Sequence, residues 1–276
     1  MLRALRERFF APPAPIDPAR WEAAERALPF LRQLAPAERE RLRDLCAKLL
    51  HGKSFVGVAG LTLTDEMCLH IAAQACLPVL HLGLGWYEGW SGVVVYPAQF
   101  RVRRSRHDAD GTVHETVEDL SGEAWDGGPV VLSWSDAQAG ASGEAGSGNV
   151  VIHEFAHKLD LLDGDADGVP PFDRRLHPHL SRDPWLDTLE DALERLRAGL
   201  DLAEERIPSH IDPESEEADP WYAALPLDPY AATDEAEFFA VSSEAFFLDA
   251  VRLRDAFPRW YELLTAFYRP TSGNAP

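Results

Sequence analysis

Apolar residues recur with helical spacing in two segments of the first 80 residues. A second signal marks where each segment begins or ends: Pro36 begins the first, while Thr64 caps the second and Pro78 ends it. We expect the first helix to belong to an N-terminal helical layer over residues 1–52, packed on the rest of the chain. Its apolar positions follow the i, i+3, i+4, i+7 stripe of an amphipathic helix: Leu42, Leu45, Cys46 and Leu49.

Two shorter runs predict strands of a small sheet. Residues 93–96 and 130–134 are rich in β-branched or aromatic side chains and are bounded by glycine or proline. Alanine, glycine and serine dominate residues 135–148, which indicates a mobile loop. The basic run at residues 101–106 is expected to be a solvated loop. The whole pattern predicts an α+β fold that is mostly helical.

An apolar run from Val150 to Ala156 surrounds a histidine, a glutamate and a second histidine. Residues four apart share a helix face, so His153 and His157 can direct both imidazoles at one ion, with Glu154 beside a metal-bound water. An ordinary amphipathic helix, with histidines bonded to backbone carbonyls, is the alternative. Because unpaired polar groups are costly to bury, the apolar surroundings favour the metal site.

A catalytic zinc ion takes three protein ligands and leaves one position for water, so a third ligand is needed. Asp163 stands at the ligand position of the pattern His-Glu-x-x-His-x-x-Gly-x-x-His/Asp, although Asp160 replaces its glycine. His177 and His179 lie among prolines and charges, where we expect solvent exposure. These three are the weaker candidates.

Glu237 is the stronger candidate for the third ligand. Positions 237, 241, 244 and 248 form one helical stripe, which places Glu237 and Glu244 on a face shared with core aliphatics. Buried carboxylates need a partner, and a metal ion is one. Glu244 is expected to support the site from beside the ligands. The alternative makes Glu237 the reciprocal glutamate of a capping box that begins at Asp234.

Tyr230 precedes Glu237 by two helical turns. If Asp228 caps this helix and Pro229 occupies its first turn, both side chains face the same site, and the phenol can donate to an oxyanion. Packing beside the proline is the ordinary alternative for this tyrosine. Asp160 lies on the ligand face of the preceding helix, where it could orient a histidine, cap the helix or face solvent.

Composition narrows the classes of function. The 276 residues carry a formal net charge of -20, which argues against a nucleic-acid partner because such binding depends on lysine and arginine. Cys68 and Cys76 lie too far apart on one helix to form a disulfide, which indicates a reducing compartment. Residues 1–15 lack the apolar stretch of a signal peptide, and no later run is long enough to span a membrane. We therefore expect a cytoplasmic protein.

Two segments resemble the Mlc titration factor A family of cytoplasmic zinc metallopeptidases: NVVIHEFAHKLD from Asn149 and YAATDEAEFFAVSSEAFF from Tyr230. The segments LTDEM, VVVYP and GPVVLSW support the resemblance. It implies a zincin-like catalytic domain over residues 53–270, similar to the protease domain of anthrax lethal factor. It also implies the site roles: His153, His157 and Glu237 as zinc ligands, Glu154 as the catalytic base, and Tyr230 as the transition-state hydrogen-bond donor.

The resemblance further implies aminopeptidase-type activity on small substrates and binding of Mlc, a transcriptional repressor of sugar uptake. We expect hydrolysis of peptide bonds, with the substrate pairing along an edge strand at Val131, Leu132 and Ser133. One alternative is a binding protein that sequesters a regulator and whose metal site is structural or vestigial. Another is a zinc hydrolase that acts on non-peptide amides.

Overall fold

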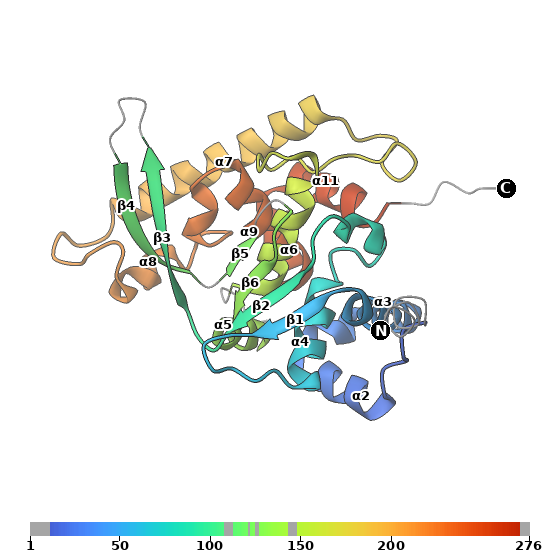
Figure 1. Ribbon diagram of the computed structural model, residues 1–276. Helices are drawn as coiled ribbons and strands as arrows, with labels where there is room; N and C mark the ends of the chain where they lie inside the picture. Colours follow the sequence, from blue (N-terminus) through green and yellow to red (C-terminus); the bar gives the residue numbers. More distant parts are fainter. Residues whose placement is uncertain (1–11, 108–112, 121, 125–126, 143–147, 271–276) are drawn as a thin grey trace.

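Helices make up most of the computed structural model, which describes residues 12–107, 113–120, 122–124, 127–142 and 148–270 (Figure 1). The predicted α+β fold class is confirmed. The helices are α2 (Pro18–Ala27), α3 (Pro36–Gly52), α4 (Asp65–Ala75), α5 (Trp134–Ala139), α6 (Val150–Asp160), α7 (Arg182–Glu204), α8 (Asp219–Tyr222), α9 (Glu235–Leu248), α10 (Ala250–Ala256) and α11 (Pro258–Tyr268).

The main sheet contains both predicted strands at its centre. Its order is β1-β2-β6-β5, in which β1 (Ser54–Gly57), β2 (Gly92–Tyr96) and β6 (Val130–Ser133) are parallel and β5 (Gly122–Ala124) is antiparallel to β6. The prediction of an edge strand at Val131, Leu132 and Ser133 is therefore wrong. Strand β6 is paired on both sides and all of its residues are buried, so its backbone has no free edge for a peptide.

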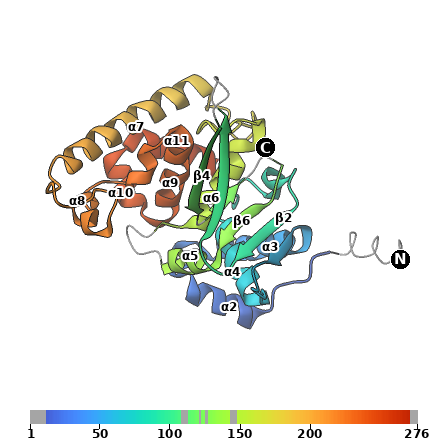
Figure 2. The ribbon, with the colours of Figure 1, turned by 60° about the vertical axis from the view of Figure 1, so that its left-hand side comes forward.

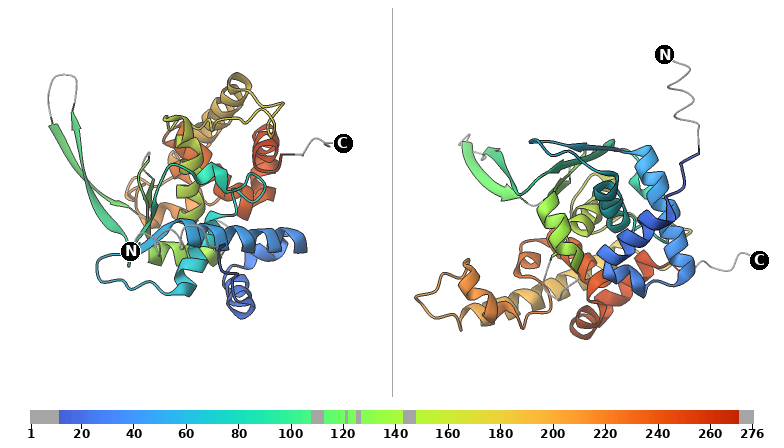
Figure 3. Two further views of the ribbon diagram at one scale, coloured as in Figure 1. Left: turned by 45° about the vertical axis from the view of Figure 1, so that its right-hand side comes forward. Right: turned by 90° about the horizontal axis from the view of Figure 1, so that it is seen from below.

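The basic run at 101–106 is not a loop. It lies within β3 (Phe100–His107), which pairs with β4 (Val113–Leu120) in an antiparallel ribbon that projects from the rest of the protein (Figures 1 and 3). The register sets Arg101 opposite Asp119 and Val102 opposite Glu118. Charge alone predicted solvation, but the pairing partner follows in the chain and satisfies the backbone of the basic run.

The predicted loop at 135–148 is partly wrong. Helix α5 and a 3₁₀ turn (Gly140–Ser142) occupy its first part, and Ser133 caps α5 by accepting a hydrogen bond from the backbone N–H of Asp136 at 3.4 Å. Residues 143–147 lie outside the described part of the chain. The composition suggested flexibility, but alanine and a serine cap also suit a short helix.

The N-terminal helices α2 and α3 lie at one end of the protein, beside α4, while α7 to α11 gather on the far side of α6 (Figure 2). Trp21 of α2 belongs to the same buried cluster as Trp185 of α7. The boundary between residues 52 and 53 stays a prediction. The first eleven residues, where no signal-peptide pattern was found, lie outside the described residues. Within the ranges described, no helix is both long and apolar enough to cross a bilayer.

Helix α6 lies between the sheet and helix α9, in contact with β5 and β6 on one side and α9 on the other. Asn149 begins it as the N-cap, since its side-chain Oδ1 accepts from the backbone N–H of Ile152 at 2.9 Å. The apolar face is fully buried, and the polar face is turned toward α9. The buried apolar residues are Val151, Ile152, Phe155, Ala156 and Leu159.

Candidate metal centre

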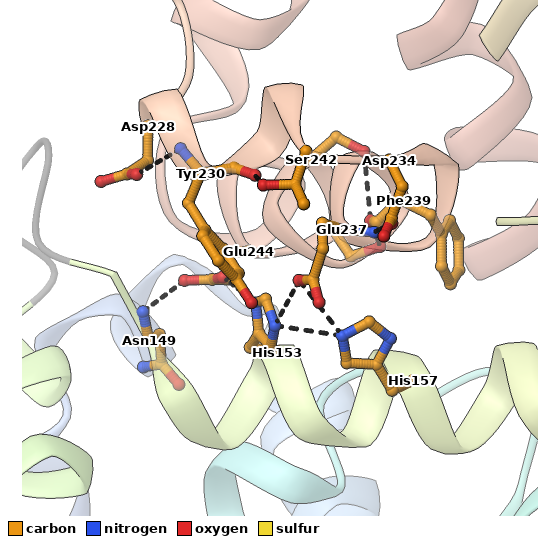
Figure 4. A network of polar contacts seen from close by, with 12 residues as sticks. Asn149, His153, His157, Asp228, Tyr230, Asp234, Glu237, Phe239, Ser242 and Glu244 are labelled. Atoms are coloured by element: carbon orange, nitrogen blue, oxygen red, sulfur yellow. Dashed lines mark hydrogen bonds and ion pairs between the residues drawn. The ribbon is translucent and has the colours of Figure 1, made fainter. Parts of the chain in front are cut away.

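Three side-chain atoms from two helices meet between α6 and α9 (Figure 4). The Nε2 atoms of His153 and His157, one helical turn apart on α6, are 3.1 Å from each other. Glu237 of α9 places Oε2 at 3.1 Å from Nε2 of His153 and 3.4 Å from Nε2 of His157. The three atoms could therefore hold one metal ion.

Glu237 lies in the first turn of α9, three residues after the N-cap. Asp234 is the N-cap and accepts from the backbone N–H of Glu237 at 2.9 Å, which is one half of the capping box that the alternative predicted. The Glu237 carboxylate, however, points at the two imidazoles (Figure 4). Its Oε2 atom is buried and makes no well-formed hydrogen bond with any residue that the structure describes. Such an acceptor between two basic nitrogens is a position suited to a cation.

The pKa shifts in the cluster also favour a position for a cation. Burial opposes the charge of Glu237, but the imidazoles outweigh burial and lower the pKa of its carboxyl below the usual value. Burial likewise disfavours a charged His153, yet Glu237 and Glu244 raise its pKa well above the usual value. The pKa of His157 is lowered by its burial and by the neighbouring His153. The carboxylate thus stays ionised and attracts positive charge.

Glu154 is buried next to His153 on α6, under the backbone of β5. A Cβ atom at Gly122 of β5 would lie 2.5 Å from Oε1 and 2.6 Å from Cγ of Glu154, so either the strand or the side chain would have to shift. Glycine at this position is therefore what allows the strand to approach the carboxylate. The edge strand of the main sheet and Glu154 are in direct contact.

Tyr230 lies in a 3₁₀ turn (Pro229–Ala232), where Asp228 accepts from its backbone N–H at 2.9 Å. The expected single helix from Asp228 through Glu237 is wrong, because the chain is extended at Asp234 and α9 begins anew. The centroid of the Tyr230 ring still lies 6.1 Å from the centroid of the His153 ring, and about half of Tyr230 (52%) is exposed. Partial burial and the charge of Glu237 raise the pKa of the phenol, which keeps it protonated as a donor.

The two carboxylates expected beside the ligands behave differently. Glu244 contacts His153, with Oε1 at 2.8 Å from Nδ1. Asp160 does not orient a histidine: Oδ2 accepts from the backbone N–H of Gly168 at 2.9 Å, and Oδ1 has no partner among the described residues. Asp160 is the last residue of α6, and its side chain holds the turn that follows the helix.

The comparison with known proteins agrees with this geometry. The family described as "Glucose-regulated metallo-peptidase M90" matches residues 2–269. This chain belongs to the M90 metallopeptidase family. Mlc titration factor A of Klebsiella pneumoniae (strain 342) is 38% identical over 250 residues, which cover 90% of this chain and 85% of that protein. Mlc titration factor A of Serratia proteamaculans (strain 568) is 36% identical over 252 residues, or 91% of this chain and 87% of that protein.

Membership of the M90 family implies a metal ion, and the cluster of His153, His157 and Glu237 is the group that the described residues provide for one. Asp163 is exposed, in a 3₁₀ turn (Leu161–Asp163) outside the cluster. The alternative third ligand is therefore not supported by the fold.

The two histidines expected to be exposed in this M90 chain differ in their exposure to solvent. His179 is exposed, but His177 is buried, donates from Nε2 to the carbonyl of Phe267 at 3.1 Å and stacks on the ring of Phe267. An irregular segment can still pack when its polar atoms are satisfied by backbone groups.

Sequence reasoning also missed Gly122 and Asn149. Asparagine before an apolar run was a readable N-cap signal, whereas Gly122 carried none.

Proposed function

We propose that the protein is a zinc-dependent peptidase with His153, His157 and Glu237 as ligands. The separations of the three ligand atoms carry the proposal. Ligands about 2.0–2.2 Å from a tetrahedral zinc ion lie roughly 3.3 Å from one another. The observed separations of 3.1, 3.1 and 3.4 Å match this value. Two imidazoles and a carboxylate also form a donor set that suits zinc.

Besides the ligands, two side chains of this protein take part in the proposed reaction. When bound, zinc supplies Lewis acidity and lowers the pKa of a water ligand to about 7. The Glu154 carboxylate accepts a proton from the attacking water and passes it to the leaving amine. The Tyr230 hydroxyl donates a hydrogen bond to the oxygen that becomes negative as water adds to the carbonyl. The raised pKa of this phenol supports a donor role.

The substrate is proposed to be an extended peptide, and small aminopeptidase substrates are included. Within the described residues β5 pairs only with β6, so its other side is the available edge of the sheet next to Glu154. A peptide that adds to this edge by backbone hydrogen bonds would bring its own carbonyls beside Glu154. This assigns substrate pairing to residues 122–124 in place of the central strand β6.

The test is the substitution Glu154→Gln, which removes the proton acceptor and leaves the three ligands in place. We expect the variant to keep its zinc, measured by elemental analysis, and to lose turnover of an amino-acid anilide or a short peptide. General-base catalysis contributes about 10²- to 10⁴-fold, so turnover should fall at least 100-fold. Undiminished hydrolysis by this variant would show that the peptidase proposal is wrong.

We also propose that the protein acts in the cytoplasm and binds an Mlc-type transcriptional repressor. The support is the name that its relatives carry, Mlc titration factor A. The measurement is binding of purified repressor by the wild type and by Glu154→Gln, each with and without a chelator. Equal binding in all four would mean that binding does not need the peptidase. Lack of binding by all four would refute the repressor proposal alone.

A further inference from the structure

Glu244 connects two parts of α6 from across the helix interface. On α9 it lies two turns after Glu237, and its carboxylate is buried against α6 (Figure 4). Oε1 lies 2.8 Å from Nδ1 of His153, and Oε2 accepts from the backbone N–H of Asn149. One side chain therefore contacts both the N-cap of the metal-binding helix and one of its histidines.

Both partners of Glu244 are donors. The backbone N–H of Asn149 can only donate, and His153 must carry its proton on Nδ1 if Nε2 is to face Glu237 and His157 with a lone pair. A carboxylate offers an acceptor to each of them. An amide of the same shape offers one acceptor and one donor, so it would oppose one of the two N–H groups.

The Asn149 end of this contact is itself held firmly. The Asn149 side chain donates to Oε1 of Gln74 at 2.7 Å and to the carbonyl of Gly140 at 3.0 Å, while its Oδ1 caps α6. These groups are buried, and their hydrogen bonds join α4, the 3₁₀ turn that follows α5 and the start of α6 at one point. Oε2 of Glu244 is thus attached to a fixed frame, and the position of Oε1 against His153 is set by that frame.

We propose that Glu244 is a positioning residue that fixes the Nδ1–H tautomer and the ring orientation of His153, and thereby raises the affinity of the cluster for zinc. This inference rests on the proposed zinc site but not on peptide hydrolysis. Carboxylates that orient a metal-bound histidine typically change metal affinity by about 10- to 100-fold. Glu244→Gln has nearly the same volume, so the effect isolates the missing acceptor.

The experiment measures the zinc dissociation constant by competition with a chromophoric chelator, together with the melting temperature of the metal-free protein. The proteins compared are the full-length wild type, Glu244→Gln and Ser243→Ala. Ser243 is the neighbouring residue on α9 and accepts from the Tyr268 hydroxyl at 2.8 Å, away from the cluster. We expect Glu244→Gln to weaken zinc binding by 10- to 100-fold. Ser243→Ala should lower the melting temperature and leave zinc affinity unchanged.

The outcomes separate the two proposals. Equal zinc affinity of the wild type and Glu244→Gln overturns the positioning role and leaves the peptidase proposal standing. A wild type that binds zinc but hydrolyses no peptide overturns the peptidase proposal. In that case a 10- to 100-fold weaker zinc affinity of Glu244→Gln still supports the positioning role of Glu244. A wild type that binds no zinc overturns both.

A second measurement does not depend on the folding of the variant. The ¹⁵N NMR spectrum of the zinc-loaded wild type should show a proton on Nδ1 of His153 that exchanges slowly with solvent. A His153 ring protonated at Nε2 in that protein would refute the assignment.

A further variant tests the need for two acceptors. Glu244→Asp keeps both carboxylate oxygens on a side chain one methylene shorter, so it should bind zinc more tightly than Glu244→Gln. The reverse order of zinc affinities would refute the positioning role.

Discussion

Asp160 makes a stability prediction that the pH dependence of unfolding can test. This carboxyl is completely buried at the end of α6, and burial raises its pKa from 3.8 to about 8 against the opposing hydrogen bond from Gly168. Between pH 3.8 and about 8 the Asp160 carboxyl is therefore protonated in the native state and ionised in the unfolded chain. The contribution of Asp160 to stability is full below about pH 4 and is lost as the pH rises toward 8.

The perturbation is Asp160→Asn, which keeps an oxygen to accept from the Gly168 N–H and removes the titrating proton. Each unit of pKa shift corresponds to about 1.4 kcal/mol. The free energy of unfolding of Asp160→Asn minus that of the wild type should therefore increase by about 1.4 kcal/mol per pH unit between pH 5 and 7. Taken from pH 4 to pH 7, the change amounts to about 4 kcal/mol.

The assay is urea unfolding of both proteins at pH 5, 6, 7 and 8, with a chelator present so that metal binding does not contribute. The increase should flatten near pH 8, where the native carboxyl ionises. Ser243→Ala is the control: it removes a buried hydrogen bond from the Tyr268 phenol, whose pKa burial raises above its usual value, so its difference from the wild type should not depend on pH between 5 and 8. A difference for Asp160→Asn that is constant from pH 5 to 7 would refute the reasoning.

Three further predictions concern the metal centre. Glu237→Ala removes one of three ligands and should weaken zinc binding by more than about 100-fold, which is the upper range for a residue that only orients a ligand. Calorimetry measures the zinc affinity of both proteins, and an unchanged affinity would exclude Glu237 as a ligand. Tyr230→Phe should lower kcat by about 10²- to 10³-fold with little change in KM, as steady-state kinetics will show, whereas a rise in KM alone would indicate a binding role. Gly122→Ala introduces a methyl group 2.5 Å from Oε1 of Glu154, so kcat should fall by up to about 100-fold at unchanged zinc content. Wild-type kcat in that variant would mean that the strand moves away without cost.

Much of the local structure was predictable from the chain itself. The stripe after Pro36, the Thr64 cap and the apolar face around His153 each depend on residues within a few turns of one another, and all three helices form as predicted. The common face of His153 and His157 is likewise a property of helical periodicity alone. The zincin-like relation to anthrax lethal factor stays a prediction.

Two of the failed predictions depended on how the chain is arranged around the site. The run at 130–134 was correctly placed in a strand over residues 130–133, whereas Trp134 begins α5. The pairing of this strand on both sides comes from β2 and β5, which periodicity cannot indicate. Tyr230 and Glu237 face the same site without sharing a helix. Tyr230 lies in a 3₁₀ turn capped by Asp228, and α9 begins separately after the Asp234 cap.

The sequence by itself determined that two imidazoles and a glutamate lie together on one turn of a buried helix, because helical spacing is set by the backbone. Only the tertiary structure decided which distant carboxylate completes the group. Asp163 is near in sequence but exposed, whereas Glu237 is brought to the histidines by the packing of α9 on α6. The helical stripe that begins at Glu237 predicted a carboxylate on an apolar face, but it did not show what that face packs against. That contact depends on the burial of apolar faces far apart in the chain, which local periodicity does not encode.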